Sequence, residues 1–292
     1  MSIRVLTNAG SNIPPELLKR WRIIVPTQKF EVNGVLHDFA TATTAMVDGW
    51  LASGAVPQVA GTTATEFAAI FRETTANGDA LIVITSSRKL TTTHDNAVRA
   101  LTAFKAEKPH AQIAVIDTGV SDTASGLLVI MAARAIEEGK SFEQVKHIVS
   151  AHCRDVTLAA VPGSVDYLVR SGRASSLRGF MANLLKVAPI VTVRDGTLVA
   201  DGTVSRAKQV KSLVDYAVTR TGTSRPVWAA VAWANDKGPV AELEKELRAH
   251  FDIRYFYKNQ LSITAYLFLG TKTFSVAVIP ISPEVAAFDR RP

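Results

Sequence analysis

The residues best suited to chemistry are two groups of threonines, each placed directly before a predicted helix. Thr62-Thr63 precedes a helix predicted to begin at Thr65, and Thr91-Thr92-Thr93 precedes a helix predicted over Thr93–Lys105. Backbone N–H groups and the positive end of the helix dipole favour an anion at such a position, and hydroxyl groups add donors. A hydroxyl at a helix start is also an ordinary N-cap, so capping alone is the alternative interpretation.

A second candidate for anion binding is the polar segment Ser164–Ser175, in which Arg170 and Arg173 flank a Ser-Gly turn. Arg173 is predicted in an open loop, where a guanidinium can bind a charged oxygen through two hydrogen bonds. The alternative is a surface arginine that binds a helix C-terminus. His94, in a polar run at a helix start, is either a ligand contact or a solvated residue.

Signatures of common enzyme classes are absent from the sequence. Gly139-Lys140-Ser141 resembles the end of a phosphate-binding loop, but that pattern requires a glycine at Arg134 and a preceding strand. No dinucleotide-binding glycine pattern and no nucleophile elbow is present. His147 and His152 lack the spacing of zinc ligands on a helix, and Cys153 is expected to be packed. We therefore predict no catalytic residue, no metal and no cofactor.

The composition limits the class of protein. With 292 residues, 47% of them apolar and 20% charged, the chain can bury a full core, which excludes intrinsic disorder. No stretch approaches 18 uninterrupted apolar residues, so stable membrane insertion is not expected. Met1–Val5 lacks the pattern of a signal peptide, and a single cysteine excludes an internal disulfide. These features favour a cytoplasmic protein.

The net charge of +7 falls entirely in residues 151–292, which carry 19 Lys/Arg and 12 Asp/Glu. This excess indicates either anionic ligands or a solvated basic face without a specific partner. The basic residues alternate with core positions, and no helix-turn-helix or aromatic stacking motif is readable. We therefore expect no nucleic acid partner.

The first half of the chain alternates apolar strands with helices. Buried strands are predicted over Ile3–Thr7, Ala80–Thr85 and Ile113–Asp117, a pattern typical of a mainly parallel sheet with helices on both faces. Ligands bind at the carboxyl ends of the strands in such α/β sheets. The residues at these ends are Thr7-Asn8, Thr85-Ser86-Ser87 and Asp117-Thr118.

The second half has a different pattern. Asp195-Gly196 predicts a hairpin turn between Ile190–Arg194 and Thr197–Ala200, and a hairpin among helices indicates a mixed sheet. A helix is also predicted over Leu177–Val187. The resulting fold class is α/β, with a parallel α/β domain over residues 1–152, an α+β domain over 153–285 and a tail over 286–292.

Three motifs in the second half resemble those of the DegV family of bacterial fatty-acid-binding proteins. Asp166–Arg173 (DYLVRSGR) resembles the family segment Glu-Tyr-Leu-x-x-Gly-Gly-Arg, and Leu184–Ile190 resembles Leu-Leu-x-Ile-Lys-Pro-Ile. Ser205–Lys208 resembles Thr-Arg-Lys-Lys. Less specific matches follow in colinear order over the first half: Thr7 with Pro14, Ser87 to Ala97, and Ile116-Asp117-Thr118.

This resemblance implies a two-domain α/β protein with a deep apolar tunnel. The acyl chain would fill the tunnel, and the carboxylate would lie near the domain junction. Members of this type can present the bound fatty acid to a separate kinase that phosphorylates the carboxyl group, and the carrier itself holds no ATP. Arg173 and Arg206 match arginines of the family motifs.

The chain departs from the family pattern at positions that face the ligand. Val59 replaces a threonine that contacts the carboxylate, whereas Thr91 replaces a serine and keeps a hydroxyl. His94 stands where the family has tyrosine, and Lys272 stands where it has histidine. The head group is therefore expected near Thr91 and the surrounding backbone N–H groups. The predicted ligand-binding residues are Gly61, Thr62, Thr63, Thr91, Thr92, His94, Arg173, Arg206 and Lys272.

These observations favour a carrier of a long-chain fatty acid or a related amphiphile, with a separate fatty-acid kinase as a further partner. Segments 59–63, 91–94 and 170–175 are then expected to meet at one site. The alternative is an enzyme that acts on a small phosphorylated or carboxylated substrate at the domain junction, through Arg173 and Lys272.

Overall fold

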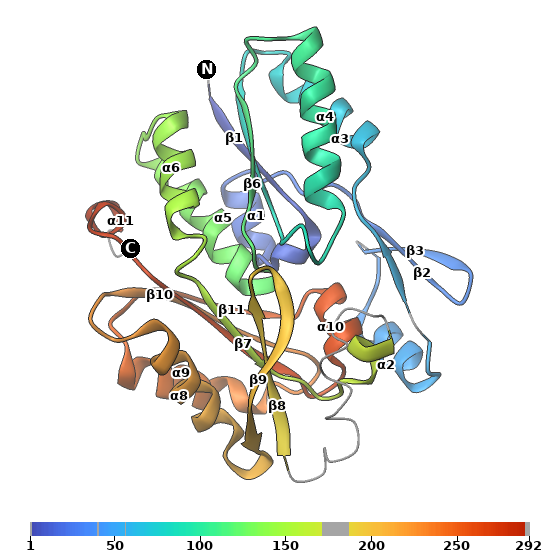
Figure 1. Cartoon of the computed structure of the whole chain (residues 1–292), viewed down its shortest axis with the longest axis vertical. Coiled ribbons are helices and arrows are strands. Elements are labelled where there is room, and N and C mark those ends of the chain that lie inside the picture. The colour runs from blue at the N-terminus through green and yellow to red at the C-terminus, as the bar shows by residue number, and fades with distance from the viewer. Residues whose placement is uncertain (1, 40, 56, 171–186, 290–292) are drawn as a thin grey trace.

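The computed structural model of the protein describes residues 2–289, apart from residues 40, 56 and 171–186. The strands of the described residues form three sheets, and helices cover their faces (Figure 1). No helix in these ranges is long and apolar enough to cross a membrane.

The first sheet has the order β1-β5-β6, and both strand pairs are parallel. Its strands are β1 (Ile3–Thr7), β5 (Ala80–Thr85) and β6 (Ile113–Asp117), as the apolar runs of the sequence predict. The central strand β5 is buried along its whole length because helices cover both faces. Figure 1 shows α3 (Ala64–Thr75) and α4 (Thr93–Glu107) on one side, with α5 (Asp122–Glu137) and α6 (Phe142–His152) on the other.

The second sheet is mixed, as the hairpin in the second half predicts. Its order is β11-β10-β12-β7-β8-β9, and β10 and β11 form a parallel pair beside antiparallel neighbours. Helices α8 (Gln209–Thr221) and α9 (Gly238–His250) cover one face, and α5 packs against the other. The strands are β7 (Thr157–Val161), β8 (Val187–Arg194), β9 (Thr197–Ser205), β10 (Val227–Trp233), β11 (Ile253–Gln260) and β12 (Phe274–Pro280).

A small antiparallel sheet interrupts the parallel pattern of the first half. Its order is β3-β2-β4, and Asn33-Gly34 forms the turn between its first two strands. Phe30 and Val32 of this sheet pack against α10 (Ile263–Leu269), so residues of the first half share a core with the second. The remaining elements of this layer are β2 (Lys29–Val32), β3 (Val35–Asp38), α2 (Thr44–Ala52) and β4 (Gln58–Ala60).

The predicted domain division lies in a connection, because α6 ends at His152 and β7 begins at Thr157. Residues 286–288, expected as the start of a tail, form the end of α11 (Pro283–Phe288). Asp289 beyond them is buried and accepts hydrogen bonds from Arg134 and from Trp228 Nε1. The helix predicted over Leu177–Val187 lies outside the described residues up to residue 186, and Val187 itself opens β8. The short elements are η1 (Ala9–Ser11), α1 (Pro15–Arg20), α7 (Asp166–Arg170) and η3 (Arg206–Lys208).

Helix α5 is the element that joins the two large sheets. It contacts β1 and β5 of the first sheet and β10 and β12 of the second, so most of its side chains are buried around the whole helix. Gly126 allows this close approach. A Cβ at that position would collide with the carbonyl oxygen of Ser11 and the hydroxyl of Tyr257.

We expect Gly126→Ala to lower the free energy of unfolding by about 1–3 kcal/mol, because an added methyl group in a filled core forces its neighbours apart. Gly49→Ala is the matched control, since Gly49 lies in α2 with open space around it. That change should raise the free energy of unfolding by about 0.5–1 kcal/mol, because alanine lowers the conformational entropy of the unfolded chain. Urea unfolding of both variants measures the difference, and equal effects would contradict the close packing of α5.

Candidate functional site

A cavity of about 330 Å³ lies at the carboxyl ends of β1 and β5, where the first sheet meets α10 and the second sheet. This volume falls at the lower end of the ~300–1,000 Å³ common for small-molecule sites. One end of the cavity is lined by polar side chains from the loops after β1 and β5 and from the start of α5. The other end is lined by apolar side chains from β7, β8, β9 and α10.

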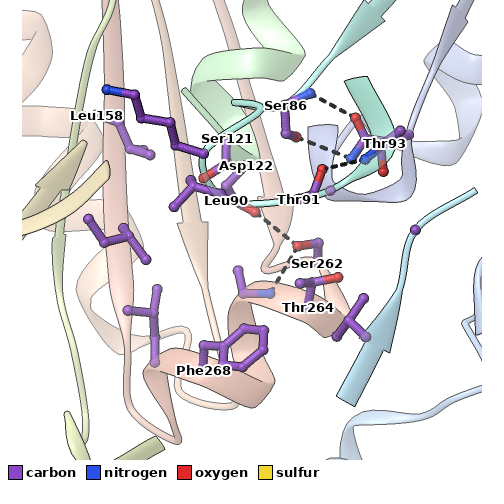
Figure 2. A pocket seen from close by; sticks show the side chains of 18 of the residues that line it. Ser86, Leu90, Thr91, Thr93, Ser121, Asp122, Leu158, Ser262, Thr264 and Phe268 are labelled. Atoms are coloured by element: carbon purple, nitrogen blue, oxygen red, sulfur yellow. Dashed lines mark hydrogen bonds between the residues drawn. The ribbon is translucent and has the colours of Figure 1, made fainter. Parts of the chain in front are cut away.

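The polar end depends on the parallel pairing of β1 and β5, which brings Asn8 and Ser86 together. Asn8 Nδ2 donates to Ser86 Oγ over 3.1 Å, and the Ser86 N–H donates back to Asn8 Oδ1 over 2.8 Å. These bonds hold the two loops in a fixed relation. Figure 2 shows Ser86 beside the helix start that carries Thr91 and Thr93.

The two threonine segments meet at Gly61, as expected from the sequence. A Cβ on Gly61 would lie 2.9 Å from both Thr92 Oγ1 and Thr93 Oγ1, so a glycine is required for this approach. Asn96 Nδ2 donates to the Thr62 carbonyl over 2.8 Å and ties the segments further. Gly61, Thr91, Thr92 and Thr93 all line the cavity.

Hydroxyl groups at this end keep hydrogen-bonding capacity for a ligand. Thr91 Oγ1 accepts the N–H of Thr93 over 3.2 Å, which leaves its own hydrogen able to donate. Thr93 Oγ1 and Ser275 Oγ are buried, line the cavity and have no hydrogen-bond partner among the described residues. Buried polar atoms without partners are rare in proteins, and a bound ligand is one way to satisfy them.

The apolar end is formed by side chains on the face of the second sheet that α10 covers. Residues of β7 alternate, so Leu158 and Ala160 point into the cavity while Ala159 packs in the core on the other face. Phe268 closes this end from α10 (Figure 2). The further apolar lining residues are Leu168, Val191, Leu198, Ala265 and Leu269.

The edge of the site is fixed by a contact between the two halves of the chain. Ser87 Oγ, in the loop after β5, donates to the carbonyl of Gly196 at the tip of the β8–β9 hairpin over 2.7 Å. The hairpin predicted from Asp195-Gly196 therefore holds the loop that carries Arg88 and Lys89, which also line the cavity.

Asp122 is a buried carboxyl group at the polar end that sequence analysis did not identify. Its side chain, in a residue 5% exposed, accepts hydrogen bonds from Asn12 Nδ2 and Ser262 Oγ, both over 3.2 Å. Figure 2 shows the bond to Ser262, which caps α10. Burial raises the pKa of Asp122 to about 6, because desolvation disfavours the carboxylate more than these bonds favour it.

Several predicted ligand-binding residues lie outside the cavity lining. Thr63 caps α3 in a capping box with Glu66, and Thr62, next to the lining residue Gly61, has a buried hydroxyl with no partner among the residues that the structure describes. His94 turns inward to Thr85, with 3.2 Å between His94 Nδ1 and Thr85 Oγ1, and burial lowers its pKa. Arg173 lies outside the described residues.

The two basic residues predicted from the second half also lie away from the lining. Lys272 is exposed in a tight turn with φ of 59°, where its N–H donates to Asn235 Oδ1. Arg206 opens η3 and is half-buried. Val59, where the family pattern has a carboxylate-contacting threonine, does line the cavity.

The residues that sequence reasoning missed have signals of unequal strength. Ser121 and Asp122 begin an otherwise apolar helix, which is a readable signal for a polar residue held at a helix start. Ser262 caps α10 and Phe268 lies within it, and this helix has seven residues, too few for a clear helical period. Ser275 lies in a strand whose every residue is buried.

Comparison with known proteins shows the family of the chain. The model of the DegV family matches residues 2–281. A DegV domain-containing protein of Caldanaerobacter subterraneus is 28% identical over 261 residues, which are 88% of this chain and 91% of that protein.

Solved structures of this family share the fold. A DegV family protein of Thermus thermophilus, described as binding fatty acid, has a TM-score of 0.87 at 22% identity, over 96% of this chain and all of that one. A stearic acid-binding protein of Eubacterium ventriosum has a TM-score of 0.83 at 19% identity, over 96% of this chain and 98% of that one.

We expect Asp122→Asn to change how stability depends on pH. The pKa is raised from its ordinary 3.8 to about 6 in the folded protein, so Asp122 contributes most to stability below about pH 4, and this contribution is lost as pH rises through 6. The variant lacks that loss, so its stability relative to wild type should increase by up to about 3 kcal/mol between pH 4 and pH 8. Urea unfolding across this range is the measurement. If the difference in unfolding free energy between the variant and wild type does not change with pH, the pKa of Asp122 is not raised by folding.

Proposed function

Because the chain belongs to the DegV family, we propose that it is a carrier that binds a long-chain fatty acid or a related amphiphile. The observation that carries this proposal is the division of one cavity into an apolar end and a polar end, where hydroxyls have no partner within the described part of the chain. The family relatives that bind fatty acids by their descriptions support the same ligand class.

The acyl chain supplies most of the binding free energy in this proposal. Each buried CH₂ group contributes about 0.8 kcal/mol, so ten of them contribute ~8 kcal/mol. One hydrogen bond to a charged head group contributes about 1.5–3 kcal/mol. The missing hydroxyl at Val59 is therefore compatible with lipid binding, and its main effect falls on the choice of head group.

The polar end determines how the head group is held. Thr91 and Thr93 offer hydroxyl donors, and both lie at the start of α4, where free N–H groups favour a partial or full negative charge. Thr92, the N-cap residue, makes no capping bond through its side chain, and the bond from the Thr93 N–H to Thr91 Oγ1 satisfies one of those groups.

The proposal also includes a protein partner, a separate fatty-acid kinase, and a location in the cytoplasm. The motif resemblance at Arg206 supports presentation of the ligand carboxyl to a separate fatty-acid kinase in the cytoplasm. The alternative of an enzyme at the domain junction loses support, since Lys272 is exposed outside the cavity lining. ATP-dependent acyl phosphate formation with such a kinase is the reaction to assay.

Native mass spectrometry of the protein purified from cells should show one bound acyl chain, because a chain buried in the apolar end dissociates slowly. Ala160→Leu should shift the retained ligand to shorter chains, since its larger side chain fills space at that end. Ala69→Leu, at an exposed position of α3, is the matched control and should leave the ligand mass unchanged. Absence of any adduct, together with no binding of added fatty acid, would overturn the proposal.

Thr91→Val should weaken binding of a fatty acid by about 10- to 150-fold, the equivalent of one hydrogen bond to a charged group. Binding of the methyl ester should weaken far less, because the ester has no charge. Thr63→Val is the control, since Thr63 caps α3 and lies outside the lining. It should lower stability by about 1 kcal/mol and leave both affinities intact. If Thr91→Val weakens binding of the acid and the ester equally, Thr91 does not contact the charged head group and acts only as a helix cap.

A further inference from the structure

Two buried acidic residues of this protein have opposite surroundings. Asp289 is paired with Arg134 and accepts a further bond from Trp228 Nε1. Within the described part of the chain, the donors to Asp122 are all neutral: Asn12 and Ser262, together with backbone N–H groups. A buried carboxylate without a cation is costly, so its retention beside a ligand cavity calls for an explanation.

The groups around Asp122 that the structure describes do not supply a balancing charge. From β11, the buried Tyr257 donates its hydroxyl to the Thr123 carbonyl over 3.1 Å, and burial raises its pKa well above the ordinary range, so it stays neutral. Helix α10 contributes Ser262 and η1 leads to Asn12, both uncharged.

Charged residues that share the cavity lie on its exposed side. Arg88 pairs with Asp95 over 2.9 Å, with both side chains about half exposed, and Lys89 is exposed next to Arg88. These residues face solvent, where water screens their charges. The buried ionisable group that a ligand head group meets at the polar end is therefore the carboxyl group of Asp122.

We propose that Asp122 determines which head group the cavity accepts, by favouring a head group that donates a hydrogen bond and disfavouring one with a fixed negative charge. This inference rests on the proposed function, because it concerns the head group of the same acyl ligand. A carboxylic acid can meet the condition by sharing one proton with Asp122, whereas a permanently ionised head group brings no proton and is accepted only while Asp122 itself is protonated. Two carboxyl groups in one buried site do not both ionise without a large penalty.

The raised pKa of Asp122, about 6, sets the direction of the pH dependence. Below this value Asp122 is neutral and can donate its own proton to a ligand carboxylate. Above it, the complex with a fatty acid must hold a proton that both free partners have lost. The affinity should then fall by up to tenfold for each pH unit above about 6.

Three ligands of equal chain length separate this effect from titration of the ligand itself. Myristic acid takes and loses a proton, tetradecyl sulfate is always anionic, and tetradecanol is always neutral and can donate. Dissociation constants measured from pH 5 to pH 8 by competition with a fluorescent acyl probe give the comparison. For wild-type protein we expect the acid and the sulfate to lose affinity by up to about 100-fold between pH 6 and pH 8, and tetradecanol to lose none.

Asp122→Asn should remove the pH dependence for the sulfate and raise its affinity at pH 8, since the amide carries no charge. Asp215→Asn is the matched control, because Asp215 is exposed on α8 and changes the net charge equally. It should reproduce the wild-type profile. The wild-type profile alone tests the inference if Asp122→Asn fails to fold.

A flat wild-type profile for both the acid and the sulfate, with tight binding of either, would overturn the role of Asp122 and leave the proposed function standing. Failure of all three ligands to bind at any pH would overturn the proposed function, and this inference with it. A sulfate profile that stays steep in Asp122→Asn would assign the titrating group to another residue.

Discussion

Helix α5 has to bury apolar side chains around its whole circumference, because a sheet lies on each side of it. The close contact at Gly126 sets how near the helix comes to η1 and to Tyr257 of β11. Its N-terminus is thereby fixed at the carboxyl edge of the first sheet, beside the start of α10. Asp122 occupies that N-terminus, so the same packing that joins the two sheets also places a carboxyl group at the polar end of the cavity.

The polar end carries groups that oppose folding when the cavity holds no ligand. Thr93 Oγ1 and Ser275 Oγ are buried without hydrogen-bond partners among the described residues, and each such group costs about 1–3 kcal/mol. Asp122 adds the desolvation of a carboxylate at neutral pH. A ligand head group that donates and accepts hydrogen bonds offsets these costs, which links ligand binding to stability through the same atoms.

Local patterns in the sequence were sufficient for most elements of the fold. The apolar run Ala80–Thr85 forms the central parallel strand, and Asn33-Gly34 and Asp195-Gly196 form their hairpin turns. The meeting of Gly61 with the threonines before α4 was also expected, although Gly61 follows β4 of the small antiparallel sheet and not a strand of the parallel one. The remainder depends on contacts between distant segments. No local signal indicates that the small sheet packs on α10, or that tertiary packing turns His94 toward Thr85. Capping by Thr63 and ligand contact predict the same residue type, and the reciprocal hydrogen bonds between Thr63 and Glu66 show that this threonine is a cap.

The two ends of the cavity come from different parts of the fold, and this separates two kinds of selectivity. The second sheet and α10 form the apolar end, so substitutions there change the length of the chain that fits. The first sheet and the start of α5 form the polar end, where Asp122 adds an acid, and Val59 of β4 lines the cavity without a hydroxyl. Both features make the cavity less favourable to a free anion than the family resemblance implies. Because the acyl chain contributes most of the binding free energy, such changes can shift the preferred head group while lipid binding is retained.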